Sequence, residues 1–327
     1  MTMNLTCSPT EPQHLHKCTQ PVRAVATQRP KGFQPMCRPF VKWVGGKSQL
    51  IEQLTELLPK DFSKWEDVTY IEPFVGGGAM LFHMLQTYNG INRAVISDIN
   101  PKLITCYRTI KTQPEALIDQ LDRLEKEYLG LPDEATRKDM YLLQRAAFNQ
   151  PQDDVTTSAI FIFLNRTCFN GLYRENKRGL FNVPHGRYAH PTICDEAKLW
   201  HVHRLLQKVQ IYCCDYTETF GHATGKTLFY FDPPYKPLSP TSSFNDYTKQ
   251  EFDDEEQVRL KLFCDKVDRA GFQFMLSNSD CPAQGNEPPF FDQLYAGYPL
   301  QRVWAKRCVN AKADRRGAIS EIVVRNF

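Results

Sequence analysis

No stretch of the 327-residue sequence approaches the roughly 20 consecutive apolar residues of a membrane span, which excludes an integral membrane protein. A heptad repeat and a Gly-X-Y period are also absent from the sequence, which excludes a coiled coil and a collagen. The 11 cysteines include no C-x-x-C pair, and residues 1–30 lack the apolar core of a signal peptide. We therefore expect a soluble cytoplasmic protein with reduced thiols, with no metal site and no membrane partner.

The net charge of the chain is only +3, but its charges are segregated. Seven basic residues stand against two acidic ones between residues 302 and 325, and five against one between residues 166 and 187. Basic patches on a nearly neutral chain are typical of a local binding site for a polyanion. Solvated surface charge is the alternative interpretation of each patch taken alone.

Hydrophobic periodicity predicts an α/β fold with an insertion. Residues 1–38 have no periodicity and are predicted to be a disordered extension. Strands and helices alternate over residues 39–106 and 207–327, whereas residues 107–206 have mostly helical patterns. The predicted strands are 69–72, 93–97, 209–213, 227–231, 272–276, 301–306 and 319–324, with Cys213 and Cys214 inside a strand. The predicted helices are 48–58, 79–88, one from Pro101, 114–128, 134–149, 155–166 and 255–269.

In an open α/β sheet the ligand binds at the carboxyl ends of the strands, where the sequence has three notable groups of residues. The first is the loop Glu72-Pro73-Phe74-Val75-Gly76-Gly77-Gly78, which follows a strand and opens a helix. Its glycines would let a ligand approach the backbone, and the helix N-terminus favours an anionic group. The loop is not G-x-G-x-x-G, which disfavours a dinucleotide-binding fold, and a simple tight turn is the alternative.

The other two groups are carboxylates at strand ends. Asp98 lies 20 residues after Gly78, a spacing that suits the hydroxyls of a ribose, and capping of the helix at Pro101 is the alternative. Asp232-Pro233-Pro234-Tyr235 follows the most apolar strand. Its prolines favour an extended Asp232 and provide carbonyls without amide donors, while Tyr235 adds a flat face.

These segments resemble the Dam-type (D12 class) DNA adenine-N6 methyltransferases. The resemblance covers residues 39–327 and rests on the segments already described together with Lys42-Trp43-Val44-Gly45-Gly46-Lys47, Leu164-Asn165-Arg166, Phe169-Asn170-Gly171-Leu172-Tyr173-Arg174 and residues 181–188. It implies a Rossmann-like sheet that binds S-adenosylmethionine (SAM) in residues 39–106 and 207–327. Residues 107–206 would be an inserted, mostly helical DNA target-recognition domain.

The resemblance also assigns a cofactor pocket. Lys47 would pair with the methionine carboxylate of SAM, Asp98 would bind its ribose hydroxyls, and Asp215 would contact its adenine. Without the resemblance, the favoured interpretations are a solvated lysine at a helix start for Lys47 and a core aromatic residue for Trp43. The implied SAM-binding residues are Trp43, Lys47, Phe74, Gly76, Gly78, Asp98, Asp215 and Asp232.

The catalytic residues implied by the resemblance are Asp232, Pro233 and Tyr235. The Asp232 carboxylate and the Pro233 carbonyl would accept the two N–H bonds of the adenine amino group, which localises the nitrogen lone pair for in-line attack on the methyl group. Neither a metal nor a strong base is needed for this chemistry. Because the target atom is inaccessible in a stacked duplex, the base would flip out and stack on Tyr235.

DNA recognition would use the segment 166–188. Phe169 would wedge into the base stack, Asn170 would contact the backbone or the orphan base, and Arg174 would read a guanine edge. The remaining contacts would be apolar ones from Leu172 and Pro184, and phosphate contacts from Lys42, Arg166 and Arg187. The pattern favours GATC as the recognition site. His185 stands where family members commonly have an apolar residue, and residues 307–312 are not the serine-rich segment of the enterobacterial members.

A basic hairpin ordered only by its own turns is the alternative to this DNA-binding role. The rival functions are an N4-cytosine DNA methyltransferase, an RNA or protein N-methyltransferase, and a non-catalytic DNA-binding regulator of the same fold. The intact set of Lys47, glycine loop, Asp98 and Asp232 argues against the regulator. We expect a monomeric, site-specific adenine methyltransferase of double-stranded DNA, for which pairing with a cognate restriction endonuclease is one biological role.

Overall fold

The structure is a computed structural model that describes residues 36–236, 252–281, 288–306 and 318–327. Met36–Phe327 forms one compact unit. The expectations for residues 1–35 and 307–312 lie outside the described residues. Cys37 is already part of the packed unit, because it is buried and its backbone N–H donates to Gln86 Oε1 at 2.6 Å. The packed chain therefore begins before Pro39, which is earlier than the predicted end of the extension at residue 38.

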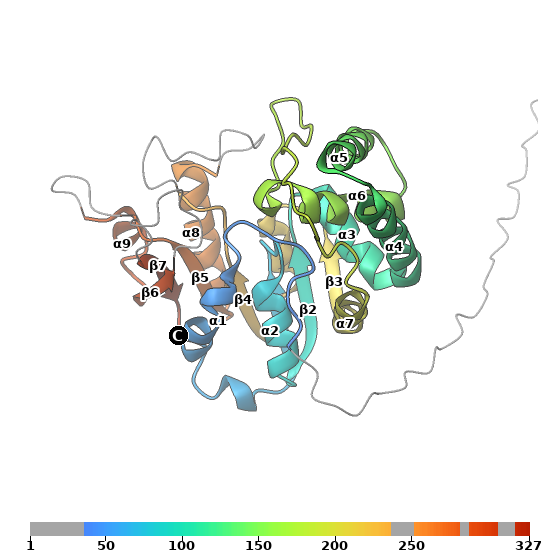
Figure 1. The fold of residues 1–327 in the computed structure, drawn as a ribbon. Coiled ribbons are helices and arrows are strands. Elements are labelled where there is room, and N and C mark those ends of the chain that lie inside the picture. The colour runs from blue at the N-terminus through green and yellow to red at the C-terminus, as the bar shows by residue number, and fades with distance from the viewer. Residues whose placement is uncertain (1–35, 237–251, 282–287, 307–317) are drawn as a thin grey trace, which may run out of the picture. The chain divides into compact units, whose positions relative to one another are not determined.

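A seven-stranded sheet forms the centre of the described chain (Figure 1). Its order is β3-β2-β1-β4-β5-β7-β6, and β7 runs antiparallel to both of its neighbours while the other pairs are parallel. The strands are β1 (Val68–Glu72), β2 (Ile91–Ser97), β3 (Val209–Tyr212), β4 (Lys226–Phe231), β5 (Gln273–Ser279), β6 (Leu300–Lys306) and β7 (Ala318–Arg325). Chain connections diverge from the β1/β4 pair, so the crevice at a topological switch point lies at the carboxyl ends of these strands. The predicted Rossmann-like α/β sheet is confirmed.

Side-chain alternation along the central strands gives the sheet two apolar faces. On β4, Phe229 and Phe231 face one side, where they pack with Leu260 and Phe263 of α8 (Asp254–Arg269). Leu228 and Tyr230 face the other side, together with residues of the helices α1 (Ile51–Glu56), α2 (Ala79–Thr87), α3 (Pro101–Thr112) and α7 (Glu196–Leu206). Burial on both faces explains why residues 228–231 of β4 are apolar or aromatic in succession rather than alternating with polar residues.

Residues 107–206 contain the three helices predicted for the insert: α4 (Pro114–Gly130), α5 (Glu134–Phe148) and α6 (Asp154–Thr167). The side chains of Asp133 and Asp153 cap α5 and α6 by accepting from the backbone N–H groups of Thr136 and Thr156. Helix α6 is buried against α3, α4 and α5, so the insert packs directly on the sheet-covering helices. The segment after α6 forms a 3-10 turn (Phe169–Gly171) and two isolated bridges, and it projects beyond these helices in Figure 1.

The structure differs from the predicted elements at several places. The predicted helix 48–58 is divided into a 3-10 turn (Lys47–Gln49) and the short α1, because the Lys47 side chain turns into the core. Cys213 and Cys214 lie beyond the end of β3, so their placement inside a strand is wrong. Helices α7 and α9 (Phe290–Leu294) and the 3-10 helix η4 (Tyr216–His222) were not predicted.

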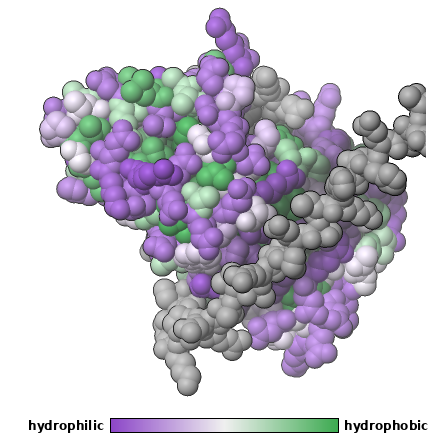
Figure 2. All heavy atoms as spheres, turned by 90° about the vertical axis from the view of Figure 1, so that its right-hand side faces the viewer, coloured by the Kyte–Doolittle hydropathy of each residue, from purple (hydrophilic) through white to green (hydrophobic). Residues whose placement is uncertain are grey.

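One face of the molecule is mainly polar. On the face shown in Figure 2, the side on which α4 and α5 lie in Figure 1, hydrophilic side chains predominate and hydrophobic ones are scattered among them. Within the described ranges, no helix is both long enough and apolar enough to cross a membrane.

Candidate active site

Four carboxylates lie at the carboxyl ends of the first four strands. Glu72 ends β1, while Asp98, Asp215 and Asp232 follow β2, β3 and β4. Since these strands are parallel and adjacent in the order β3-β2-β1-β4, the four residues line one edge of the sheet. The sequence predicted this edge as the site, but the four carboxylates have different surroundings.

The Asp232 carboxylate forms an ion pair with Lys47. Lys47 Nζ lies 2.6 Å from Asp232 Oδ1 and donates to the carbonyl of Gly45 at 2.8 Å. The Lys47 side chain is 3% exposed, whereas that of Asp232 is 19% exposed. Burial raises the pKa of Asp232 to about 6, and the Lys47 ammonium limits this rise. Asp232 therefore remains ionised at neutral pH and is the more accessible member of the pair.

Glu321 on β7 belongs to the same cluster, although it was not predicted from the sequence. Its carboxylate accepts a hydrogen bond from the Tyr235 hydroxyl, and its Oε2 lies 3.8 Å from Lys47 Nζ. Lys47 Nζ also lies 4.5 Å from the centroid of the Tyr235 ring. Burial raises the pKa of Tyr235, and the carboxylates of Asp232 and Glu321 raise it further, so the hydroxyl stays protonated as a donor. The sequence feature that could have indicated Glu321 is an acidic residue directly before the apolar residues 322–324 of a predicted strand.

Glu72 is the buried acid of the cluster and was likewise not assigned to the site. Its side chain is 2% exposed, and its Oε2 accepts a hydrogen bond from the Tyr70 hydroxyl at 2.7 Å. Burial raises the pKa of Glu72 to about 8, and the Asp232 carboxylate contributes to the rise, whereas the bond from Tyr70 opposes it. Glu72 is therefore mostly protonated at neutral pH and adds little negative charge beside Asp232.

The glycine loop is shaped by close packing. Gly76 and Gly78 have φ angles of +46° and +73°, in the left-handed region that favours glycine. A Cβ on Gly76 would lie 2.7 Å from the Trp43 ring, and one on Gly78 would lie 2.5 Å from the Tyr107 hydroxyl. The Trp43 ring also stacks on Tyr173, with centroids 5.8 Å apart. Trp43 is therefore a packed aromatic residue between the loop and the insert, and the protein itself requires both glycines.

Asp98 is held against this loop by backbone donors. Its Oδ2 accepts from the N–H of Gly76 at 3.1 Å, and its Oδ1 accepts from the N–H of Asn100 at 2.9 Å. Burial raises the pKa of Asp98, and these backbone bonds oppose the rise. The cap of α3 is Asn100, whose side chain accepts from the N–H groups of Lys102 and Leu103, so the alternative interpretation of Asp98 as the cap is wrong.

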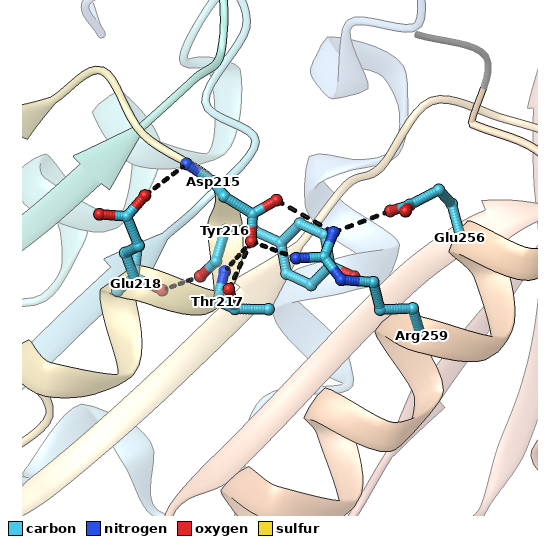
Figure 3. A network of polar contacts seen from close by, with 7 residues as sticks. Asp215, Tyr216, Thr217, Glu218, Glu256 and Arg259 are labelled. Atoms are coloured by element: carbon cyan, nitrogen blue, oxygen red, sulfur yellow. Dashed lines mark hydrogen bonds and ion pairs between the residues drawn. The ribbon is translucent and has the colours of Figure 1, made fainter.

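Asp215 is engaged in the network of Figure 3. Its carboxylate pairs with Arg259 of α8, with N···O distances of 2.7 and 3.1 Å, and accepts from the N–H of Thr217 at 3.0 Å. The Glu218 side chain reciprocates by accepting from the N–H of Asp215, which completes a capping box at the start of η4. These contacts join the end of β3 to α8, and the predicted contact of Asp215 with the cofactor adenine stays a prediction.

Phe74 and Pro233 flank the same edge of the sheet. The half-buried Phe74 ring packs on Tyr216, with centroids 5.1 Å apart. Pro233 is buried, whereas the following Pro234 is exposed and its carbonyl accepts from Gln257 Nε2 at 3.3 Å. The fold thus holds the turn after Asp232 through α8.

Part of the predicted DNA-binding set lies together at the tip of the segment after α6. Phe169 is 51% exposed, and its N–H donates to the carbonyl of the exposed Pro184 at 2.9 Å. Asn170 is exposed with a φ of +54°, and its N–H donates to the Tyr188 hydroxyl at 3.1 Å. Lys42 reaches the same place, with Nζ 4.8 Å from the centroid of the Tyr188 ring. Two distant parts of the chain therefore form one exposed surface.

The other predicted DNA-binding residues differ in exposure. Arg187 is 75% exposed, with Nε 3.2 Å from Glu134 Oε1. Arg174 Nε donates to Asn182 Oδ1 at 2.7 Å, which orients its guanidinium across the bridged segment. Leu172 is half-buried against the core.

Arg166 and His185 turn inward. Arg166 Nη2 donates to the carbonyl of Phe40 at 2.6 Å, its Nε is buried, and burial lowers its pKa. A guanidinium held in this way is not presented to a phosphate, which argues against the predicted role of Arg166. His185 Nε2 lies 2.8 Å from the Tyr128 hydroxyl and its ring packs on Tyr141, so this partly buried histidine is held by aromatic residues of α4 and α5.

Comparison with known proteins agrees with this geometry. The family of D12 class N6 adenine-specific DNA methyltransferases matches residues 43–309. The chain belongs to this family. The D12 methyltransferase is 46% identical over 294 residues to the Type II methyltransferase M.MjaIII of Methanocaldococcus jannaschii, covering 89% of this chain and 99% of that protein.

Other relatives extend the same picture. The Type II methyltransferase M1.LlaDCHI of Lactococcus lactis is 36% identical over 89% of this chain and 95% of its own length. The DNA adenine methylase of Escherichia coli K12 is 32% identical over 88% of this chain and 94% of its own length. The D12 methyltransferase is therefore an adenine-specific DNA methyltransferase with DNA as its substrate. This family places the chain with the adenine-specific DNA methyltransferases rather than with the rival N4-cytosine, RNA or protein methyltransferases.

Proposed function

We propose that the D12 methyltransferase transfers a methyl group directly from SAM to N6 of an adenine that has flipped out of duplex DNA. The single observation that carries the proposal is the partly exposed carboxylate of Asp232 at the end of β4. The charged and acidic side chains of Lys47, Glu72 and Glu321 surround it. An ionised acid next to a bare proline carbonyl and an aromatic ring suits an aromatic amino group as substrate.

The residues along the sheet edge fit SAM as the methyl donor. The Asp98 carboxylate accepts bonds from the backbone of Gly76, Asn100 and Ile99, which leaves acceptor capacity among its roughly four lone-pair sites for a ribose hydroxyl. The loop with Phe74, Gly76 and Gly78 opens helix α2, whose N-terminus favours the anionic carboxylate of SAM, whereas the Lys47 ammonium is already paired with Asp232. When bound, SAM supplies an electrophilic methyl group on a sulfonium.

The protein's own groups then orient and stabilise the adenine amino group. Asp232 and the Pro233 carbonyl accept its two N–H bonds, which favours a localised lone pair on N6 directed at the methyl carbon. With SAM bound, methyl transfer would place positive charge on N6, which the Asp232 carboxylate would stabilise. The proton leaves N6 after transfer, so no strong base is required. Tyr235 stacks on the extruded base and offsets part of the few kcal/mol that flipping costs.

We propose that the exposed tip formed by Lys42, Phe169, Asn170 and Pro184 enters the DNA, with Arg187 at a phosphate. The exposure of this tip and the exposed aromatic ring of Phe169 support this role. Arg174, oriented by Asn182, would read guanine in a GATC site, and Leu172 would contact a neighbouring base. The enzyme would act as a monomer. Because two relatives are named Type II methyltransferases, pairing with a restriction endonuclease is the biological setting we favour.

Mapping of methylated bases tests the proposal directly. DNA from cells that express the wild-type protein should carry N6-methyladenine in GATC. Asp232→Asn, which keeps the size but removes the charge, should slow transfer by roughly 10²–10³-fold in an assay with labelled SAM. Asp61→Asn is the matched control, since the Asp61 side chain is 55% exposed and lies away from the site. A rate for Asp232→Asn close to that of the control would refute the mechanism, and methylation at another sequence would refute GATC.

A further inference from the structure

Lys47 lies between two carboxylates. Its Nζ is 2.6 Å from Asp232 Oδ1 and 3.8 Å from Glu321 Oε2. With only 3% of its side chain exposed, the ammonium cannot leave Asp232 for solvent without losing its buried partners. A buried cation that loses one carboxylate without gaining another is strongly disfavoured.

In this resting ion pair the Lys47 ammonium competes with the target amino group for the Asp232 carboxylate. Besides Lys47, the Asp232 carboxylate has a hydrogen bond with Ser277, which is buried and also bonded to the Tyr230 hydroxyl at 2.9 Å. Ser277 is buried and held by Tyr230, whereas the Lys47 ammonium has a second carboxylate within reach, so Lys47 is the partner that can withdraw from Asp232. An ammonium that stayed in contact with Asp232 would also oppose the positive charge that develops on N6.

We propose that Glu321 is a positioning residue that receives the Lys47 ammonium when the target amino group takes its place on Asp232. The inference rests on the proposed role of Asp232. The required movement is small, because the Lys47–Glu321 distance need shorten by only about 1 Å to reach that of a charge-assisted hydrogen bond. Lys47 remains paired throughout, and Asp232 is left with its full charge for the amino group.

Tyr235 connects this transfer to the arrival of the base. Its hydroxyl donates to Glu321, and its ring lies 4.5 Å from Lys47 Nζ. The same ring is the proposed stacking surface for the extruded adenine. Tyr235 thus contacts both Glu321 and Lys47, and its ring is also the proposed stacking surface for the adenine.

The first test separates charge from packing. Glu321→Gln keeps an oxygen that accepts from Tyr235 but has no charge, and it should slow single-turnover methylation at saturating SAM by about tenfold or more. In a Lys47→Met background the same substitution should change the rate by less than about twofold, because no ammonium remains to be received. Glu52→Gln, an exposed change on the nearby α1, is the control and should leave the rate unaltered.

The second test does not depend on turnover. In the presence of S-adenosylhomocysteine, the wild type should bind DNA with adenine at the target position more tightly than DNA with unsubstituted purine there. Glu321→Gln should lose this preference while binding the purine-containing DNA as the wild type does, because Lys47 stays on Asp232.

The outcomes discriminate between the inference and the function on which it rests. If Glu321→Gln methylates normally while Asp232→Asn is inactive, Glu321 does not receive the ammonium, but the proposed role of Asp232 stands. Normal methylation by Glu321→Gln is the result expected if Lys47 moves to the carboxylate of the cofactor instead. Equal losses from Glu321→Gln with and without Lys47 would also overturn the inference. Normal methylation by Asp232→Asn would instead overturn the proposed function.

Discussion

Glu72 provides a quantitative test of the electrostatics of the site. Its carboxyl is 2% exposed, bonded to Tyr70, and has a pKa raised to about 8 by burial. Because the folded pKa is higher than that of an exposed glutamate, the folded protein binds more protons than the unfolded chain between the two values. Stability should therefore fall as pH rises toward about 8 and then level off. Glu72→Gln retains an acceptor for Tyr70 and removes the titration.

The expected size follows from the pKa difference. Each pH unit between the unfolded and folded pKa changes the free energy of unfolding by about 1.4 kcal/mol. Between about pH 6 and the folded pKa near 8, the wild type should lose roughly 2–3 kcal/mol relative to Glu72→Gln. Chemical denaturation of both proteins at a series of pH values from about 6 to 9 measures this difference in the free energy of unfolding. As pH rises, the variant should become more stable relative to the wild type.

The control is Glu52→Gln, which removes an exposed carboxylate and should parallel the wild type at every pH. A constant difference between Glu72→Gln and the wild type across this range would refute the reasoning, because it would mean that the buried carboxyl titrates as it does in water. A variant that gained stability relative to the wild type as pH falls would contradict its sign.

Two further predictions concern catalysis and recognition. The single-turnover rate should rise about tenfold per pH unit below the Asp232 pKa of about 6 and level off above it, since the reaction needs the carboxylate. Lys47→Met should move this limb to higher pH because the ammonium lowers that pKa; a limb that stays in place would contradict the assignment. Arg174→Ala should lose about 1–3 kcal/mol of discrimination against a substituted guanine in competition assays, while SAM affinity measured by calorimetry is unchanged. Loss of SAM binding would show that this arginine serves the cofactor side.

The sheet and its catalytic edge could be predicted because local sequence determines them. Residues 228–231 are Leu, Phe, Tyr and Phe, as expected for a strand buried on both faces, and the following prolines favour an extended Asp232. Similar arguments located Asp98 after β2 and the glycine loop after β1. Helical periodicity was likewise sufficient for α4, α5 and α6, whose lengths differ from the predictions by only a few residues.

What the sequence did not reveal depends on tertiary neighbours. Glu321 reaches the site because β7 inserts beside β5 in antiparallel register, where Glu321 pairs with Ser279, and local patterns do not specify that order. Asp215 follows a strand as Asp98 does, but the proximity of Arg259 on α8 gives its carboxylate a different partner. Arg166 lies in a basic segment, yet the packing of α6 turns it toward Phe40. In each case a distant residue decides what the side chain contacts.

The side chain of Asn165 has a consequence for engineering new specificities. Its Oδ1 accepts from the N–H of Lys42 at 2.8 Å, and its Nδ2 donates to the carbonyls of Lys42 and Gly171 at 2.8 and 3.0 Å. A Cβ on Gly171 would lie 2.5 Å from the Lys42 side chain. A chimera that exchanged residues 107–206 alone would replace Asn165 but keep Lys42. The hydrogen bonds between these two residues would then join segments from different proteins. When the target-recognition insert is exchanged between such enzymes, the segment around Lys42 should be exchanged together with it.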